Sequence, residues 1–278
     1  MKKFNEADLT KAVLDRISKA DNPRERDLLT SLVEHAHAFV RETELTEAEW
    51  FSAIKFLLDS AEISDHARNE FILFSDILGV SMLVDAINNR KENGGTESSV
   101  LGPFYQENAP ELENESSFIK TVDSGEKVYI SGKVLDTSGN PISGATLDIW
   151  QTASNGLYHM QDADQLEHNL CGKLTTDNNG NYSFTTIKPV SYAIPTDGPV
   201  GSFLKIYGSH PFRPAHIHFI ISAEGYQSVT TELYSSDDEY LESDAVYGVK
   251  NSLIVDYIKD SENPVSWSLK YNFSLELK

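Results

Sequence analysis

Residues 1–95 carry apolar side chains at the spacing of amphipathic helices. One apolar stripe runs from Leu29 to Val40, and a second runs from Trp50 to Leu58. Thr46 stands three residues before Glu49, which is the spacing of a capping box, just ahead of the second stripe. The pattern therefore predicts one helix on each stripe.

A third helix is expected from about Ser64 through Ile87. Between Phe71 and Val84 its side chains are apolar nearly all round, whereas a helix on a protein surface keeps one polar face. We therefore expect this helix to be buried, against the second part of the chain or against a second subunit.

After residue 126 the apolar positions alternate, which is typical of strands with one buried face. Turn-forming sequences at 138–141 and 177–180 separate two pairs of these segments. The expected strands are 127–135, 145–150, 172–176, 182–187, 216–221, 228–234 and 268–275. Many short strands with turns between them favour an antiparallel β-sandwich. The predicted fold is therefore α+β, with an N-terminal helical domain over residues 1–97 and a β-sandwich domain over residues 98–278.

The chain has 43 acidic and 23 basic residues among 278, a formal net charge of −20. This charge argues against nucleic-acid binding and against docking on anionic lipid, because both depend on basic side chains. No apolar run is long enough for a membrane span, and the two lysines at the start precede no apolar stretch. The single cysteine, Cys171, excludes intrachain disulfides and an all-cysteine metal cluster. A cytoplasmic globular protein is the resulting prediction.

Candidate chemistry begins with the pair His216 and His218 in the sequence Arg-Pro-Ala-His-Ile-His-Phe. Side chains two positions apart on a strand project from the same face, so the two imidazoles can share a metal ion. Chance pairing on an exposed strand is the alternative. The apolar run 219–221 makes a solvated strand the weaker interpretation.

Two tyrosines stand in unusual settings upstream of the histidine pair. Tyr158 follows Asn-Gly-Leu in a loop, and Tyr192 lies between Pro189 and Pro195. Each could equally be ordinary packing in a chain with 12 tyrosines. A phenol has a pKa of about 10, so it ionises at neutral pH only beside a strong Lewis acid. If these tyrosines are ligands, a hard ion such as Fe(III) is the natural candidate.

Four separated runs in this order resemble the intradiol ring-cleaving dioxygenases. They are Gly132 to Tyr158, Thr185 to Pro195, Asp197 to Gly201, and His210 to Phe219. The resemblance extends over essentially the whole chain, including the helical N-terminal region and residues 101–105. It implies an enzyme that uses O₂ to open the ring of a small aromatic 1,2-diol. It also implies a homodimer formed through the N-terminal helices, which can enclose a lipid.

The resemblance further implies a mononuclear non-haem Fe(III) centre. Its ligands would be Tyr158 and His218 in equatorial positions, and Tyr192 and His216 in axial positions. The substrate would displace Tyr192, which could then accept a substrate proton as a general base. Arg213, three residues before His216, would stabilise negative charge that develops during the reaction, although a surface ion pair is the alternative.

Ten residues resemble the substrate pocket of this family by position. They are Leu73, Asp76, Val100, Leu101, Gly102, Pro103, Phe104, Ile194, Pro195 and Val246. Asp76 is the only carboxylate among them, and it could accept a hydrogen bond from a third ring hydroxyl or simply cap a helix. Residues 197–201 and 243–250 also look more like the branch that cleaves hydroxyquinol. Hydroxyquinol is therefore the preferred substrate, giving maleylacetate, and catechol, giving cis,cis-muconate, is the alternative.

Two departures from the family pattern stay open. Catechol-cleaving relatives often have glutamine where Glu232 stands, and relatives often have arginine where Cys171 stands. His159 and His168 are expected at the surface or just behind the ligands. A different class of function also stays open, since Gly132-x-Val134 followed by a Gly-x-Pro turn recurs in non-catalytic sandwich modules that bind carbohydrate or act as spacers.

Overall fold

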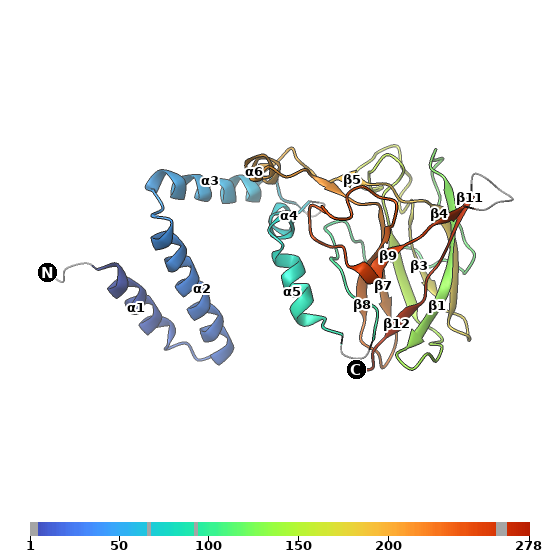
Figure 1. Cartoon of the computed structure of the whole chain (residues 1–278), viewed down its shortest axis with the longest axis horizontal. Coiled ribbons are helices and arrows are strands. Elements are labelled where there is room, and N and C mark those ends of the chain that lie inside the picture. The colour runs from blue at the N-terminus through green and yellow to red at the C-terminus, as the bar shows by residue number, and fades with distance from the viewer. Residues whose placement is uncertain (1–4, 66–67, 92–93, 260–265) are drawn as a thin grey trace. The chain divides into compact units, whose positions relative to one another are not determined.

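A computed structural model describes residues 5–65, 68–91, 94–259 and 266–278. The chain forms two compact units, Met1–Leu58 and Asp59–Lys278, each with its own internal packing (Figure 1). The boundary expected from the sequence, after residue 97, marks the change from helical to strand-like texture and stays a prediction.

Three helices account for the first unit: α1 (Glu6–Ile17), α2 (Pro23–Glu42) and α3 (Glu47–Ile63), the last of which crosses into the second unit. The two helices expected from the apolar stripes, α2 and α3, are confirmed. So is the capping box: the Thr46 N–H donates to Glu49 Oε2 at 2.9 Å, and the Glu49 N–H donates to Thr46 Oγ1 at 3.3 Å. Sequence analysis did not identify α1, which pairs with α2 through a bond between Thr10 Oγ1 and His37 Nδ1.

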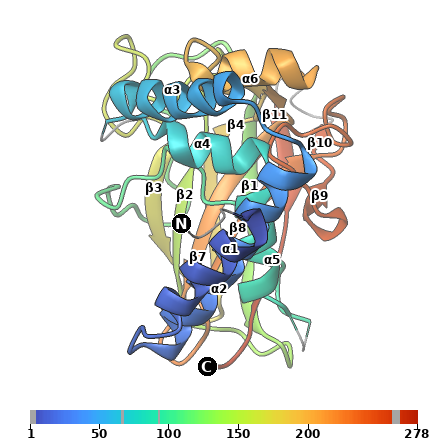
Figure 2. The ribbon, with the colours of Figure 1, turned by 90° about the vertical axis from the view of Figure 1, so that its left-hand side faces the viewer.

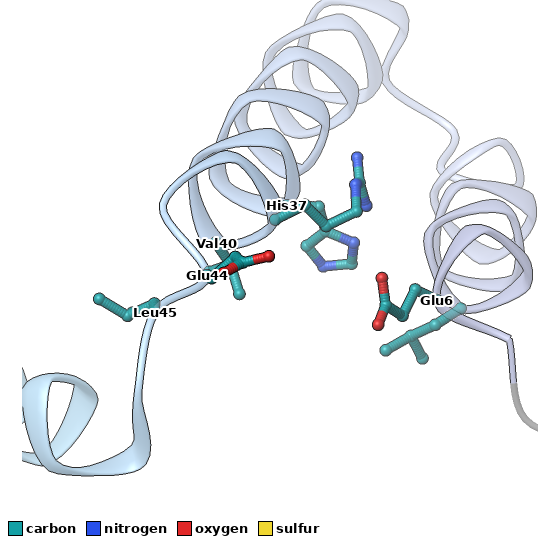
Figure 3. A pocket seen from close by; sticks show the side chains of 7 residues that line it. Glu6, His37, Val40, Glu44 and Leu45 are labelled. Atoms are coloured by element: carbon teal, nitrogen blue, oxygen red, sulfur yellow. The ribbon is translucent and has the colours of Figure 1, made fainter.

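An open pocket of about 620 Å³ lies between α1 and α2 (Figure 3). Its walls combine aliphatic and charged side chains, namely Glu6, Leu9, His37, Val40, Arg41, Glu44 and Leu45. No helix among residues 5–65, 68–91, 94–259 and 266–278 is both long and apolar enough to cross a membrane.

The third expected helix is wrong as a single element. The structure has two helices there, α4 (Glu70–Ile77) and α5 (Val80–Asn88), and part of the predicted span, residues 66–67, lies outside the described residues. Gly79 separates them with φ +69°, a left-handed conformation that most side chains disfavour. Leu73 is buried, whereas Leu83 is 62% exposed in the chain alone. Contacts within a single chain therefore do not bury all sides of α4 and α5.

Two five-stranded sheets pack face to face in the second unit. One contains β1 (Lys127–Asp136), β4 (Asn181–Ile187), β10 (Ile258–Lys259), β11 (Ser266–Lys270) and β12 (Phe273–Leu275). The other has the order β3 (Cys171–Thr175), β2 (Thr146–Trp150), β7 (His216–Ser222), β8 (Val229–Ser235) and β9 (Ile254–Val255). A separate pair joins β5 (Tyr192–Ala193) to β6 (Phe212–Arg213), and η1 (Asn251–Leu253) precedes β9.

The sandwich is confirmed, but its sheets are mixed rather than wholly antiparallel. β1 pairs in parallel with β11 and β12, and β8 pairs in parallel with β9. The last expected strand, 268–275, is divided between β11 and β12. Alternating apolar positions identify a buried face but carry no information on strand direction, so the sequence could not reveal this.

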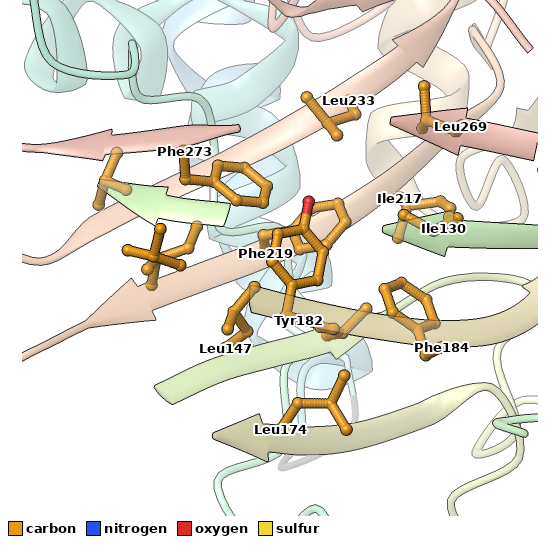
Figure 4. Close-up of a cluster of buried hydrophobic side chains, with 14 of the residues drawn as sticks. Ile130, Leu147, Leu174, Tyr182, Phe184, Ile217, Phe219, Leu233, Leu269 and Phe273 are labelled. Carbon is orange, nitrogen blue, oxygen red and sulfur yellow. The ribbon is translucent and has the colours of Figure 1, made fainter. Parts of the chain in front are cut away.

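The inner faces of the two sheets form the core of the unit (Figure 4). Ile130 and Phe184 from one sheet face Leu147 and Phe219 from the other, and all four are at most 1% exposed. At one end of the sandwich α4 runs beside α6 (Pro199–Tyr207), as Figures 1 and 2 both show. This packing places the helix that carries Asp76 against the segment that joins β5, which carries Tyr192, to β6, which carries Arg213.

Gly132 in β1 should tolerate no side chain. A Cβ at this position would lie 1.6 Å from the Tyr271 carbonyl oxygen, where β11 gives way to β12. We expect Gly132→Ala to lower the free energy of unfolding by roughly 3 kcal/mol or more, because backbone must move. Gly144→Ala is the matched control: its Cβ meets nothing within 4 Å, and only its φ of +71° is unfavourable, a cost of about 1 kcal/mol. Chemical denaturation measures both, and equal losses would contradict the prediction.

Candidate metal centre

Four side chains that sequence analysis singled out meet in the second unit. Tyr158 extends from the loop after β2, Tyr192 from β5, and His216 and His218 from β7. Tyr158 Oη lies 2.9 Å from His218 Nε2 and 3.1 Å from Tyr192 Oη, and the two histidine Nε2 atoms are 3.2 Å apart. All four residues are buried. The structure thus brings together oxygen and nitrogen donors from three separate segments.

Neighbouring groups orient both imidazoles. His216 Nδ1 lies 2.6 Å from the Pro214 carbonyl oxygen, so Nδ1 carries the proton and Nε2 has the lone pair. His218 Nδ1 lies 3.0 Å from Glu232 Oε1, but this approach lacks the geometry of a hydrogen bond. Trp150 stacks on the His218 ring at 4.7 Å with an interplanar angle of 5°. His218 Nε2 therefore faces the Tyr158 hydroxyl, whereas His216 Nε2 lies between His218 Nε2 at 3.2 Å and Arg213 Nη1 at 3.1 Å.

Burial sets the ionisation of these groups. It lowers the pKa of His216, with a further contribution from Arg213, and it lowers the pKa of His218 well below the usual value. Both imidazoles are therefore neutral at pH 7, as a metal ligand must be. Burial raises the pKa of Tyr158, with Tyr192 adding to it, and raises the pKa of Tyr192. Phenolates at this place require a cation.

The arrangement fits a single metal ion. Two donor atoms that each lie about 2.0–2.1 Å from one ion, at angles of 90–109°, are about 2.9–3.4 Å apart. The three separations between donors, 2.9, 3.1 and 3.2 Å, fall in this range. The four residues can therefore hold one metal ion.

Arg213 is buried beside this cluster, and it contacts the candidate ligand His216 directly. Its Nη1 lies 3.1 Å from His216 Nε2 and donates to Glu232 Oε1 at 3.0 Å. Its Nη2 donates to Glu232 Oε2 at 2.8 Å, and its Nε donates to Asp244 Oδ1 at 3.1 Å. The Tyr234 hydroxyl also contacts Glu232. The guanidinium is thus held by two carboxylates rather than exposed in a surface ion pair.

The Glu232 carboxylate therefore has a partner. Burial alone would raise the pKa of Glu232, but the charge of Arg213 outweighs burial and lowers it. Burial alone would lower the pKa of the Arg213 guanidinium. The charges of Asp244 and Glu232 outweigh burial and raise this pKa. Glu232 pairs with Arg213 and lies 3.0 Å from His218 Nδ1, and its Oε1 is 3.8 Å from His216 Nε2. It supports the ligands from behind.

Sequence analysis did not assign a role to Asp244, although this residue fixes Arg213. Asp244 also accepts hydrogen bonds from the N–H groups of Val246 at 3.3 Å and Gly248 at 2.9 Å. Its position in an irregular segment after β8 gives no periodic signal. The only available signal was an isolated Asp followed by the apolar pair Ala245 and Val246.

Of the ten expected pocket residues, several lie against the cluster. A Cβ on Gly102 would be 3.3 Å from His218 Cε1, and the Phe104 ring packs 4.8 Å from the Tyr158 ring. Ile194 follows Tyr192 by two residues, and its N–H donates to the Pro211 carbonyl. Six of the ten are buried, namely Leu73, Asp76, Val100, Phe104, Ile194 and Val246. Gly102, Pro103 and Pro195 are partly exposed, and Leu101 is 42% exposed.

Asp76 is the buried carboxyl on α4, and it is 4% exposed. Burial raises its pKa to about 6, partly offset by a hydrogen bond to Ser81 and by the charge of Arg213. Glu232 and Asp244 also act on this pKa, so Asp76 lies within electrostatic reach of the Arg213 network. The structure therefore places one carboxyl near the cluster that is not paired with the guanidinium.

Comparisons with known proteins agree with this arrangement. The family described as "Dioxygenase" matches residues 100–278, and "Catechol dioxygenase N terminus" matches residues 22–96. The chain is 43% identical to hydroxyquinol 1,2-dioxygenase from Rhizobium sp., across 98% of this chain and 96% of the relative. It is 41% identical to catechol 1,2-dioxygenase from Candida albicans, across 96% and 91%.

Solved structures give the same result. Hydroxyquinol 1,2-dioxygenase from Pseudomonas putida superimposes with a TM-score of 0.90 at 45% identity, covering 98% of this chain and 99% of that one. Catechol 1,2-dioxygenase from Pseudomonas arvilla gives 0.85 at 28% identity, covering 98% and 92%. With family matches over both parts of the chain and full-length relatives above 40% identity, the chain belongs to the intradiol ring-cleaving dioxygenase family.

Proposed function

We propose that this protein cleaves hydroxyquinol, with O₂, between its two adjacent hydroxyl-bearing carbons to give maleylacetate. The observation that carries this choice of diol is Asp76, a buried carboxyl within electrostatic reach of Arg213 that forms no ion pair with the part of the chain that the structure describes. Hydroxyquinol 1,2-dioxygenases among the relatives, at 43% and 45% identity, support the same choice. Catechol is the second candidate, supported by the Candida albicans relative at 41% identity.

The proposed cofactor is one Fe(III), held by Tyr158, Tyr192, His216 and His218. Two phenol oxygens and two neutral imidazoles are donors suited to a hard, trivalent ion, and the separations between them support a single shared ion. When bound, Fe(III) supplies the Lewis acidity that lets both hydroxyls of the diol ionise and prepares the ring for reaction with O₂. This donor set also disfavours the alternative of a non-catalytic sandwich module.

Tyr192 is proposed as the base that receives a proton from the incoming diol. Its hydroxyl is 3.1 Å from Tyr158 Oη, and β5 pairs with β6 so that Tyr192 lies directly across from Arg213. A phenolate at Tyr192 that leaves the ion becomes a strong base, because burial raises its pKa in the absence of a cation. The proton would then reside on Tyr192 Oη for the rest of the cycle.

Arg213 is proposed to stabilise the negative charge that develops on the substrate. Glu232 and Asp244 fix the guanidinium in place, so no reorganisation is needed when that charge appears. Its Nη1 already reaches the ligand His216 at 3.1 Å, which supports a position at the edge of the reacting ring.

Asp76 is proposed to accept a hydrogen bond from the third hydroxyl of hydroxyquinol. Catechol has no such group, so with catechol the buried carboxyl would keep only its hydrogen bond to Ser81, which is a basis for discrimination. We expect kcat/KM for hydroxyquinol to exceed that for catechol by about 100-fold, and Asp76→Ala to reduce this ratio at least 10-fold. Steady-state oxygen uptake with both diols measures it, and the catechol rate of the variant is the internal control. A wild-type preference for catechol would exclude hydroxyquinol as the main substrate.

The helical region is proposed to form a homodimer and to enclose a lipid. The support is a set of exposed apolar side chains on α2 and α3, including Leu32 at 64%, Phe51 at 62% and Leu58 at 65%. Such side chains in number mark surfaces that a partner covers. Sedimentation velocity should give a dimer at micromolar concentration, and organic extraction should release lipid. A monomer free of lipid would contradict both parts.

A further inference from the structure

A second group of metal-binding side chains lies on the loop that presents Tyr158. His159 and His168 belong to residues 151–170, between β2 and β3, and Cys171 is the first residue of β3. One ligand atom from each of the three lies within 4.8 Å of the others. None of these atoms belongs to the cluster of Tyr158, Tyr192 and the two β7 histidines.

Buried polar atoms in this group have no partner among the described residues. His159 Nε2 and His168 Nδ1 are both inaccessible to solvent and make no hydrogen bond. Leaving such an atom unsatisfied costs about 1–3 kcal/mol, so native proteins normally supply a partner. Cys171, the only cysteine of the chain, is 4% exposed beside them. One metal ion could be the partner of both ring nitrogens and of the buried thiol.

His168 can present its buried ring nitrogen to an ion. Its Nε2 lies 3.7 Å from the exposed Glu167 carboxylate, too far for a hydrogen bond, and its buried Nδ1 makes no hydrogen bond to the described residues. His159 needs one adjustment. Its Nδ1 now accepts a long contact, 3.3 Å, from the His168 N–H, and coordination through Nε2 would require the proton to move to Nδ1. The contact given up is therefore a weak one.

The Cys171 side chain would become a thiolate only if a metal ion were bound to it. Burial raises the pKa of Cys171 to about 12, and the Asp148 carboxylate adds to this, so the thiol stays protonated without a cation. Asp148 Oδ1 is buried and makes no hydrogen bond to the described residues, while Asp148 Oδ2 lies 3.3 Å from Lys173 Nζ. Lys120 and Lys173 act in the opposite sense. A coordinated cation would displace the thiol proton.

We propose that His159, His168 and Cys171 form a second metal site, which binds a borderline divalent ion such as Zn²⁺ and leaves a fourth position for water. Two imidazoles and a thiolate are the donors that this class of ion prefers, whereas Mg²⁺ and Ca²⁺ require oxygen. The site closes the loop 151–170, which contains no helix or strand, onto the first residue of β3. A metal ion here clamps the segment that presents Tyr158.

Cobalt titration of the iron-loaded protein tests the proposal, because Co²⁺ bound to a thiolate absorbs by charge transfer. Loading with iron first keeps Co²⁺ out of the other cluster. We expect one Co²⁺ per chain, displaced by Zn²⁺, and loss of the charge-transfer band in Cys171→Ser. His168→Ala should weaken Zn²⁺ binding by more than about 100-fold, because the loss of an outer-shell partner alone costs about 10–100-fold. His35→Ala, at an exposed histidine on α2, is the matched control and should bind as the wild type.

Zinc X-ray absorption gives an independent readout that does not depend on activity. One sulfur at about 2.3 Å and nitrogens at about 2.0–2.1 Å are expected. Thermal unfolding without added metal checks that each variant folds. Added Zn²⁺ should raise the unfolding midpoint of the wild type but not that of Cys171→Ser or His168→Ala. No divalent-ion uptake by the iron-loaded wild type, or uptake that Cys171→Ser and His168→Ala both leave unchanged, would overturn the site.

Discussion

Replacing His218 by alanine is expected to remove most of the bound iron and to lower the ring-cleaving rate by roughly 10³-fold or more. The rate estimate follows from the several kcal/mol that a metal Lewis acid contributes to such a reaction. His218 Nε2 lies 2.9 Å from Tyr158 Oη and 3.2 Å from His216 Nε2, so it contacts donors from two segments. Its removal takes one of four ligands and also the surface on which Trp150 stacks.

Iron content by elemental analysis and oxygen uptake on the purified variant measure this effect. His210→Ala is a suitable control, since His210 lies in the same segment but its Nδ1 accepts only from the Phe212 N–H at 3.1 Å. The control should keep its iron. A His218→Ala protein that retains one iron per chain would remove His218 from the ligand set, and circular dichroism would show whether the variant is folded.

The candidate site was predictable because its chemistry is concentrated in short segments. His216 and His218 share a strand face by the two-residue period alone, and the structure places them as that period requires. The tyrosines had no such periodicity. Their meeting with the histidines depends on the register Trp150↔His218 and on the pairing of β5 with β6, which are long-range contacts that local sequence does not encode.

The errors in the predicted fold also arise where backbone conformation or long-range contacts, rather than local hydrophobicity, decide the structure. The helix expected over 64–87 is interrupted at Gly79, where hydrophobicity stays high and only the backbone conformation changes. Strand direction in the first sheet depends on the return of β11 and β12 to β1, far along the chain. Asp244 was missed because its partner, Arg213, lies on another element. Local periodicity in the sequence identifies helices, strands and their buried faces. Which strands pair and which side chains meet depends on tertiary contacts.

Replacing Arg213 by methionine is expected to cost both stability and activity. Arg213 is 3% exposed and donates to Glu232 at 2.8 and 3.0 Å and to Asp244 at 3.1 Å. Methionine fills similar space but leaves two buried carboxylates without a counter-charge. Breaking a buried ion pair in this way costs about 3–5 kcal/mol, and loss of the positive charge at the reacting ring should lower kcat about 10²–10³-fold.

The stability loss should depend on pH, because Arg213 sets the ionisation of Glu232. With Arg213 present the pKa of Glu232 is lowered, so in the wild type the pair stabilises the fold above the unfolded pKa of 4.5 and is lost only in strong acid. Without Arg213 burial dominates and the pKa of Glu232 rises above 4.5. The variant then loses stability as pH increases through that raised value. We therefore expect urea denaturation to show a larger difference from wild type at pH 7 than at pH 5.

A second substitution separates charge from packing in this variant. Arg213→Met combined with Glu232→Gln removes one uncompensated carboxylate and keeps its shape, so it should recover part of the lost stability and flatten the pH dependence. It should not restore kcat, because the guanidinium is still absent from the reacting ring. Equal stability of the single and double variants at pH 7 would mean that the Glu232 charge does not cause the loss. Full activity in either variant would remove Arg213 from the reaction altogether.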